Sequence, residues 1–150
     1  MAGFLTKLKT AKTAPEIRDC PIHDGFGIRL VKPDQETLDA EVQGSRVIKK
    51  GRERFVREKW APIYVKNRFR GWFGMTPEIF FGYLEMPYAP ADLQPIFDAN
   101  GGELPYTPED AATMLLKVYD HLVVVPVNDF IDDWTKESTE ADAAVDSKSA

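Results

Sequence analysis

The clearest hydrophobic pattern in the chain lies between residues 107 and 126. Apolar residues recur from Ala112 to Val123 at the spacing of one helix face. Thr107 and Pro108 stand just ahead of this stripe, and threonine caps helices well while proline fits the first helical position. The pattern therefore predicts a helix that starts here and that Pro126 breaks or restarts.

The first half of the chain predicts one extended segment and two helices. Apolar residues alternate with glycine or polar residues over residues 22–32, and this period of two indicates a strand or one edge of a hairpin. Asp34 suits the N-cap of a short helix that follows. Residues 52–70 carry an apolar stripe that includes Trp60 and predict the central helix, in which Pro62 predicts a kink or a break.

The stretch over residues 75–98 is rich in proline and aromatic residues, and it predicts only short helices. Thr76, Pro77 and Glu78 resemble a helix start, with threonine as the cap and proline in the first helical position. Asn100-Gly101-Gly102 is a strong turn signal.

Together these elements predict a mainly α fold: a small single helical domain over residues 21–135 with a short extended N-terminal segment. Residues 1–20, rich in Lys, Thr and Ala, predict a mobile N-terminal arm. Residues 136–150 are polar, acidic and without periodicity, and they predict a disordered acidic C-terminal tail. The 150 residues fit one domain, and the 43% of hydrophobic residues are enough for a core.

Charge is distributed unevenly along the chain. The net charge of −5 argues against attraction of nucleic acid or anionic lipid through bulk charge. Residues 46–70, however, contain ten Lys or Arg and two Glu, a local charge of +8, which leaves −13 for the remainder. The protein is therefore strongly polarised.

Candidate catalytic chemistry is sparse. Cys20 and His23 make half of a zinc site without a second half. Three aspartates over residues 129–133 lack the glycine and the final glutamate of a calcium loop. The sequence thus predicts a protein that is not an enzyme and needs no cofactor or metal ion. A single cysteine suits a reducing cytoplasm, and the longest aliphatic run, residues 122–125, is too short to cross a membrane.

Aromatic residues interleave with the bases over residues 46–72, and three interpretations stay open. Such rings and charges bind single-stranded nucleic acid in other proteins. Alternatively, the rings form the core face of the helix and the bases its solvated face, which the helical spacing of Trp60 and Tyr64 favours. In the third interpretation, which we prefer, the basic face docks an acidic partner protein or the acidic tail of the chain itself.

Three segments of the chain are similar to a known family. The first segment is Trp72-Phe-Gly74-Met75, which precedes a turn. After that turn come Pro105-Tyr-Thr-Pro-Glu-Asp110 and a helix that carries Leu115-Leu116. Upstream, Gly27-Ile-Arg-Leu-Val-Lys-Pro-Asp-Gln-Glu-Thr-Leu38 resembles an extended segment that runs into a first helix. This order of elements, over about residues 22–135, resembles the tail assembly chaperones of long-tailed bacteriophages.

The resemblance implies a small helical protein that acts in virion assembly in the host cytoplasm. It would bind the long helical tape measure protein, help to recruit tail tube protein subunits, and leave before the virion is complete. Its partners would be proteins, not a membrane, and its oligomeric state is open. The alternative function is that of a nucleic-acid-binding accessory protein that uses residues 46–72.

A chaperone of this kind needs an exposed aromatic surface with charged rims, to which an amphipathic helix can bind. We expect this surface on the central helix and its continuation, at Arg57, Trp60, Tyr64, Arg68, Phe69, Phe73, Phe80 and Phe81. Trp72, Tyr106, Leu115 and Leu116 are expected in the core instead.

Overall fold

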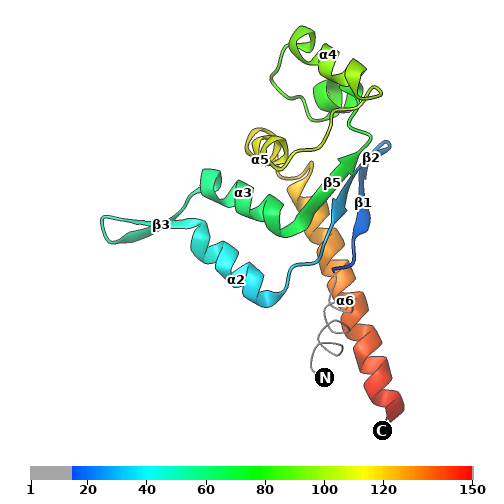
Figure 1. Ribbon diagram of the computed structural model, residues 1–150. Helices are drawn as coiled ribbons and strands as arrows, with labels where there is room; N and C mark the ends of the chain where they lie inside the picture. Colours follow the sequence, from blue (N-terminus) through cyan, green and yellow to red (C-terminus); the bar gives the residue numbers. More distant parts are fainter. Residues whose placement is uncertain (1–14, 150) are drawn as a thin grey trace, which may run out of the picture.

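The fold is a mixed α/β arrangement with 52% helix and 19% strand (Figure 1). A computed structural model describes the backbone of residues 15–149 and the side chains of residues 15–139. The elements, in chain order, are β1 (Arg18–His23), β2 (Phe26–Leu30), α2 (Gln35–Gly44), β3 (Arg46–Lys49), β4 (Arg52–Phe55), α3 (Arg57–Arg68), β5 (Phe69–Phe73), the π-helix η1 (Glu78–Tyr83), α4 (Pro90–Ala99), α5 (Pro108–Lys117) and α6 (Val124–Ser149). The prediction of a mainly helical domain is therefore right in its helices but misses two small antiparallel sheets.

The larger sheet has three antiparallel strands in the order β1-β2-β5. The central strand β2 pairs Ile28 with Cys20 of β1 and with Trp72 of β5. Its apolar residues Phe26, Ile28 and Leu30 are all buried. The predicted strand over residues 22–32 is thus a hairpin, whose turn at Asp24 and Gly25 has positive φ at both residues.

The predicted boundary of the N-terminal arm is wrong at its end. Residues 18–20 belong to β1, because this strand pairs with β2 and buries Cys20. Residues 1–14 of that predicted arm lie outside the described residues.

The central helix is shorter than predicted. Residues 52–55 form β4, which pairs with β3 through a two-residue turn at Lys50 (φ 53°) and Gly51 (φ 72°). Helix α3 then runs without a break through Pro62, contrary to one predicted outcome. Pro62 is exposed, and the buried residues beside it hold the helix against the core.

The predicted disordered tail differs from the observed backbone, because α6 continues as a helix to Ser149. Pro126 lies in the first turn of α6, where a missing N–H costs no intrahelical hydrogen bond. Residues 136–149 include several Ala, Glu and Lys, which are good helix formers. Figure 1 shows α6 lying along β1, and Arg18 of that strand donates a hydrogen bond to Glu137 at 3.1 Å.

The core lies where the larger sheet, α3, α5 and the start of α6 meet. The fully buried side chains there include Tyr64, Ile28 and Leu115. Burial of Trp72 and Leu115 was predicted correctly, whereas Tyr106 is half-buried. Leu116 is exposed, contrary to prediction, because one step along a helix turns a side chain by about 100° away from the core face.

Candidate partner-binding surfaces

The predicted aromatic and basic residues of α3 form a continuous stack. Arg57 lies over the ring of Trp60 at 5.0 Å, and the Trp60 and Tyr64 rings are 4.8 Å apart. The Arg68 guanidinium lies 3.8 Å from the Tyr64 ring centre, and the Phe69 ring is 6.0 Å from that ring. Arg57, Trp60, Tyr64 and Arg68 thus lie on one side of α3, and Phe69 is the first residue of β5.

Most of that side faces the core and not a partner. Tyr64, Arg68 and Phe69 are buried, with Tyr64 only 2% exposed. Only Arg57 and Trp60, at the start of the helix, stay partly exposed. The predicted binding surface is corrected on this point, because hydrophobic spacing identifies one face of a helix without telling whether that face is covered.

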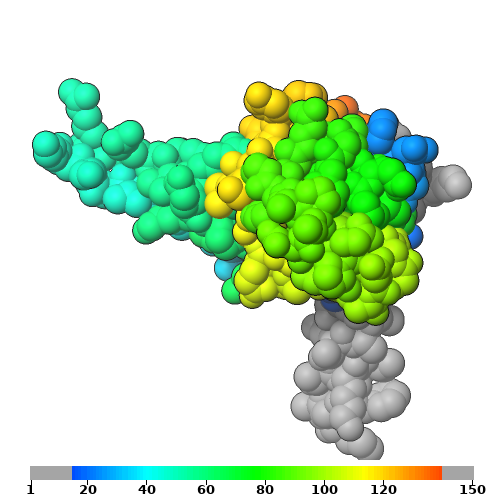
Figure 2. All heavy atoms as spheres, turned by 90° about the horizontal axis from the view of Figure 1, so that it is seen from above, coloured from blue at the N-terminus to red at the C-terminus, as the bar shows by residue number. Residues whose placement is uncertain are grey.

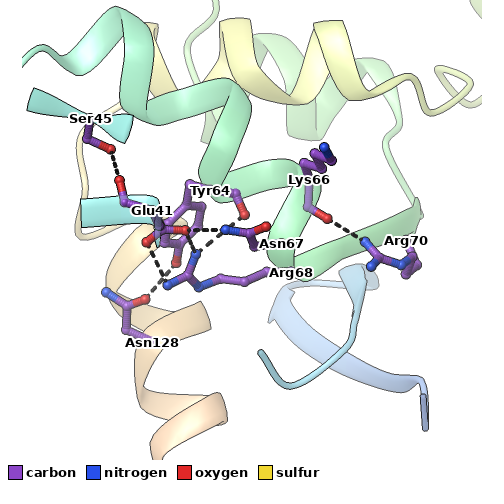
Figure 3. Close-up of polar contacts among 8 residues, drawn as sticks. All are labelled: Glu41, Ser45, Tyr64, Lys66, Asn67, Arg68, Arg70 and Asn128. Atoms are coloured by element: carbon purple, nitrogen blue, oxygen red, sulfur yellow. Dashed lines mark hydrogen bonds and ion pairs between the residues drawn. The ribbon is translucent and has the colours of Figure 1, made fainter. Parts of the chain in front are cut away.

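Arg68 is buried because it has a partner that the sequence reasoning missed. Its guanidinium makes two hydrogen bonds to the Glu41 carboxylate, one of them at 3.0 Å (Figure 3). Asn67 donates a further hydrogen bond to Glu41 at 3.1 Å, and the Tyr64 hydroxyl donates to Asn128 at 2.6 Å. Burial raises the pKa of Tyr64 above its ordinary value of 10.0. This network joins α2, α3 and α6 and is structural.

The other three predicted residues lie apart from the stack. Phe80 is buried and contacts Phe81 and Phe97 at ring distances of 5.0 and 6.0 Å, in the lobe built by η1 and α4. Phe73 is half-buried beneath Arg29, at 5.3 Å. The eight predicted residues therefore do not form one continuous exposed surface.

An exposed aromatic surface does exist around Arg57. This side chain donates hydrogen bonds to the Leu115 carbonyl oxygen at 2.8 Å and to the Asp120 carboxylate at 2.5 Å. Trp60 packs against Arg57, and Tyr119, next to Asp120, is 73% exposed. We call Arg57, Trp60, Tyr119 and Asp120 the Arg57 surface; it combines apolar area with one charge of each sign.

The hairpin of β3 and β4 is a second exposed feature, and we call residues 46–55 the basic arm. Figures 1 and 2 both show it projecting away from the rest of the molecule. The register places Ile48 and Phe55 on one face of the ribbon, and Lys49, Arg52 and Arg54 on the other. Ile48 is 77% exposed and Phe55 58% exposed, so the arm presents two large apolar side chains among its bases.

A third feature is an apolar cavity of about 200 Å³ in the lobe formed by η1, α4 and α5. Three methionines line it, Met75, Met86 and Met114, together with Trp72 and Phe80 from deeper in the core. Tyr88 and Ile96 lie at its exposed rim. Residues 71–117, which make this lobe, contain seven Asp or Glu and one base, Lys117 at the end of α5. We call it the acidic lobe.

Three segments of the chain, which begin at Gly27, Trp72 and Pro105, meet around Trp72. Ile28 of the extended segment pairs with Trp72 across the sheet. The Trp72 indole N–H donates to the Leu104 carbonyl oxygen at 2.8 Å, and its ring meets Tyr106 edge-on at 5.1 Å. Gly74 donates its N–H to the Glu103 carboxylate. The motif segments are thus one packed unit, although more than thirty residues of chain separate Trp72 from Tyr106.

The residues considered for chemistry lie apart from one another. Cys20 is buried, and burial raises the pKa of its thiol from 9.0 to about 11. His23 is exposed and stacks on Tyr83 with ring centres 3.9 Å apart. Among the described residues, no group of three or more His, Cys, Asp or Glu side chains is placed to hold a metal ion.

No helix among residues 15–149 is long and apolar enough to cross a membrane. No family model, curated protein or solved structure matches this chain. Its function is therefore inferred from the surfaces and the motif unit described above.

Proposed function

We propose that this chain is a tail assembly chaperone of a long-tailed bacteriophage, which binds the tape measure protein and helps to recruit tail tube subunits. The observation that supports this proposal is the packing of the three motif segments around Trp72. The Trp72 indole is hydrogen-bonded to the Leu104 carbonyl oxygen and packed on Tyr106, so the segments that carry the resemblance form one unit in the fold.

The Arg57 surface is the best place for a tape measure helix to bind. An amphipathic helix can lay its apolar face on Trp60, which is partly exposed, and on Tyr119, which is largely exposed. Aromatic and arginine side chains dominate the energetics of protein interfaces. The Arg57–Asp120 pair offers a charge of each sign to the polar flanks of such a helix.

The experiment is co-expression of the tagged chain with the tape measure protein encoded beside it, followed by co-purification. We expect the two proteins to elute together. Tyr119→Asp changes only an exposed side chain, and should lower the recovered tape measure protein at least about tenfold, since truncating an aromatic anchor costs about 2 kcal/mol or more. Ile17→Asp is the matched control, because Ile17 is also exposed but lies just before β1.

Two outcomes would contradict the proposal. The first is a tape measure protein that precipitates whether or not this chain is present. The second is equal loss of binding in Tyr119→Asp and Ile17→Asp, which would show a general effect of added charge and not a surface at Arg57.

A nucleic-acid-binding function is the second candidate, and the basic arm is the observation that favours it. A two-stranded β-ribbon fits the major groove of duplex DNA, and this ribbon carries Lys49, Arg52 and Arg54 on one face. Against it, the rings of Tyr64 and Phe69 are buried and cannot stack on bases. Binding of a DNA duplex that weakens steeply as salt rises would support this second function.

A further inference from the structure

We propose that the basic arm of one copy docks on the acidic lobe of a second copy, with Ile48 inserted into the apolar cavity. This contact does not depend on the chaperone function. Three independent properties of the chain support it: an exposed apolar anchor, a cavity of matching size, and opposite charge on the two surfaces.

The arm has the features of a binding element without a partner. Ile48 is the most exposed of the large hydrophobic side chains among the described residues, at 77%. Within residues 15–149, the strands β3 and β4 form a sheet of their own and pair only with each other. Lys50 at the tip has φ 53°, a backbone conformation that asparagine and glycine adopt more easily. The tight turn therefore holds a positive charge at the tip of the arm.

The cavity is the right size for a side chain and small for a metabolite. Small-molecule sites enclose about 300–1,000 Å³, whereas this cavity encloses about 200 Å³. Its methionine lining is flexible and adapts to the shape of an inserted aliphatic group. Tyr88 and Ile96 at the rim are exposed in the single chain and would be covered by the arm.

The charges of the two surfaces are complementary. The basic arm contains five Lys or Arg and one Glu, whereas residues 71–117 contain seven Asp or Glu and one base, Lys117, whose ammonium lies 5.9 Å from the centre of the Tyr88 ring. Two arms would repel each other, and so would two lobes. Complementary potentials favour one pairing and suppress the others, so an arm is expected to meet a lobe.

This pairing must form between copies. In Figures 1 and 2 the arm points away from the lobe that carries α4. The arm also lies between α2 and α3 in sequence, and the buried Glu41–Arg68 pair fixes these two helices to each other. In the part of the chain that the structure describes, one copy therefore presents one exposed arm and one open cavity. A contact of this head-to-tail kind produces rings or open chains instead of a closed symmetric dimer.

The test uses the full chain in sedimentation velocity experiments over a range of protein concentrations. We expect concentration-dependent assembly that weakens as salt rises. Ile48→Asp removes the anchor from the arm, and Ile96→Lys places a positive charge at the cavity rim. Each variant should weaken assembly about tenfold or more, which is the effect of losing the burial of one isoleucine side chain. Ile17→Asp, at an exposed isoleucine before β1, should assemble like the original chain.

Mixing the two variants gives the decisive result. Ile48→Asp keeps an intact cavity, and Ile96→Lys keeps an intact arm. The mixture should therefore form a one-to-one dimer that grows no further, although each variant alone stays monomeric. Circular dichroism of each variant verifies that it is folded.

Three results would overturn the proposal. One is an original chain that stays monomeric at the highest concentration that remains in solution. Another is undiminished assembly of Ile96→Lys, which would indicate arm-to-arm pairing. The third is a mixture of the two variants that remains monomeric.

Discussion

Glu41→Gln tests the buried network that holds α2, α3 and α6 together. The Glu41 and Arg68 side chains are each only 8% exposed, so the substitution leaves the Arg68 charge buried without its carboxylate. Removal of one partner from a buried ion pair costs about 3–5 kcal/mol. For a chain of 150 residues, a loss of about 3 kcal/mol corresponds to a fall in Tm of roughly 6–12 °C.

The matched control is Glu53→Gln, which breaks the Arg46–Glu53 pair on the basic arm. These side chains are 43% and 50% exposed, so solvent screens the pair and the expected loss is below about 1 kcal/mol. Urea unfolding followed by tryptophan fluorescence measures the free energy of unfolding of both variants.

A double substitution separates the buried charge from the packing. Glu41→Leu combined with Arg68→Met removes both charges, and it should be clearly more stable than Glu41→Gln, since apolar replacements for buried pairs are often neutral. If Glu41→Gln lowers the free energy of unfolding no more than Glu53→Gln does, the buried pair does not hold the helices together, because Arg68 would then be hydrated despite its burial.

Three further predictions concern local structure. Gly74→Ala should destabilise the fold by about 3 kcal/mol or more, because Gly74 has φ +72° and an added methyl group would lie 2.0 Å from the Gly25 carbonyl oxygen. Gly101→Ala, at a glycine that also has positive φ but has open space around it, should cost only about 1–2 kcal/mol in the same urea assay. Thr107→Ala should cost about 1 kcal/mol by removing the N-cap of α5, with Thr107→Ser close to neutral. Cys20 should react with iodoacetamide at pH 8 at least about a hundredfold more slowly in the folded than in the unfolded chain, since its pKa is raised from 9.0 to about 11; equal rates would contradict this burial.

Helix starts could be predicted from the sequence because their chemistry is local. Thr107 accepts a hydrogen bond from the Asp110 N–H at 3.1 Å, and Asp34 accepts one from the Thr37 N–H at 2.7 Å, as the capping patterns predicted. Each of these contacts spans three residues, so the information needed to predict it lies within one window of sequence.

The sheets and the burial of the α3 stack could not be predicted in this way. Strand β5 follows α3 directly, and it becomes a strand by pairing with β2, which lies about forty residues earlier. The sequence predicts Arg68 as part of an exposed surface, because its partner Glu41 lies 27 residues away on a different helix. The one sign of that pair in the sequence is the spacing of Leu38, Glu41 and Ser45, which places an acid on the inward face of α2.

Several residues of the predicted partner site are buried for a related reason. Helical spacing correctly grouped Arg57, Trp60 and Tyr64, but a hydrophobic stripe normally marks the face that the protein buries itself. Ile48 lies in a charged hairpin that has no such stripe. Tyr119 lies on the apolar stripe predicted for residues 112–123, but α5 ends at Lys117 and leaves the Tyr119 side chain exposed. Their exposure depends on the tertiary fold, which short sequence patterns do not encode.

The measurement that most directly tests the proposed chaperone function is the amount of tape measure protein in the soluble fraction of cells with and without this chain. We predict that the tape measure protein stays in solution only when this chain is co-expressed, and that it elutes together with the chain. A tape measure protein that is equally soluble, or equally aggregated, in both cultures would contradict it.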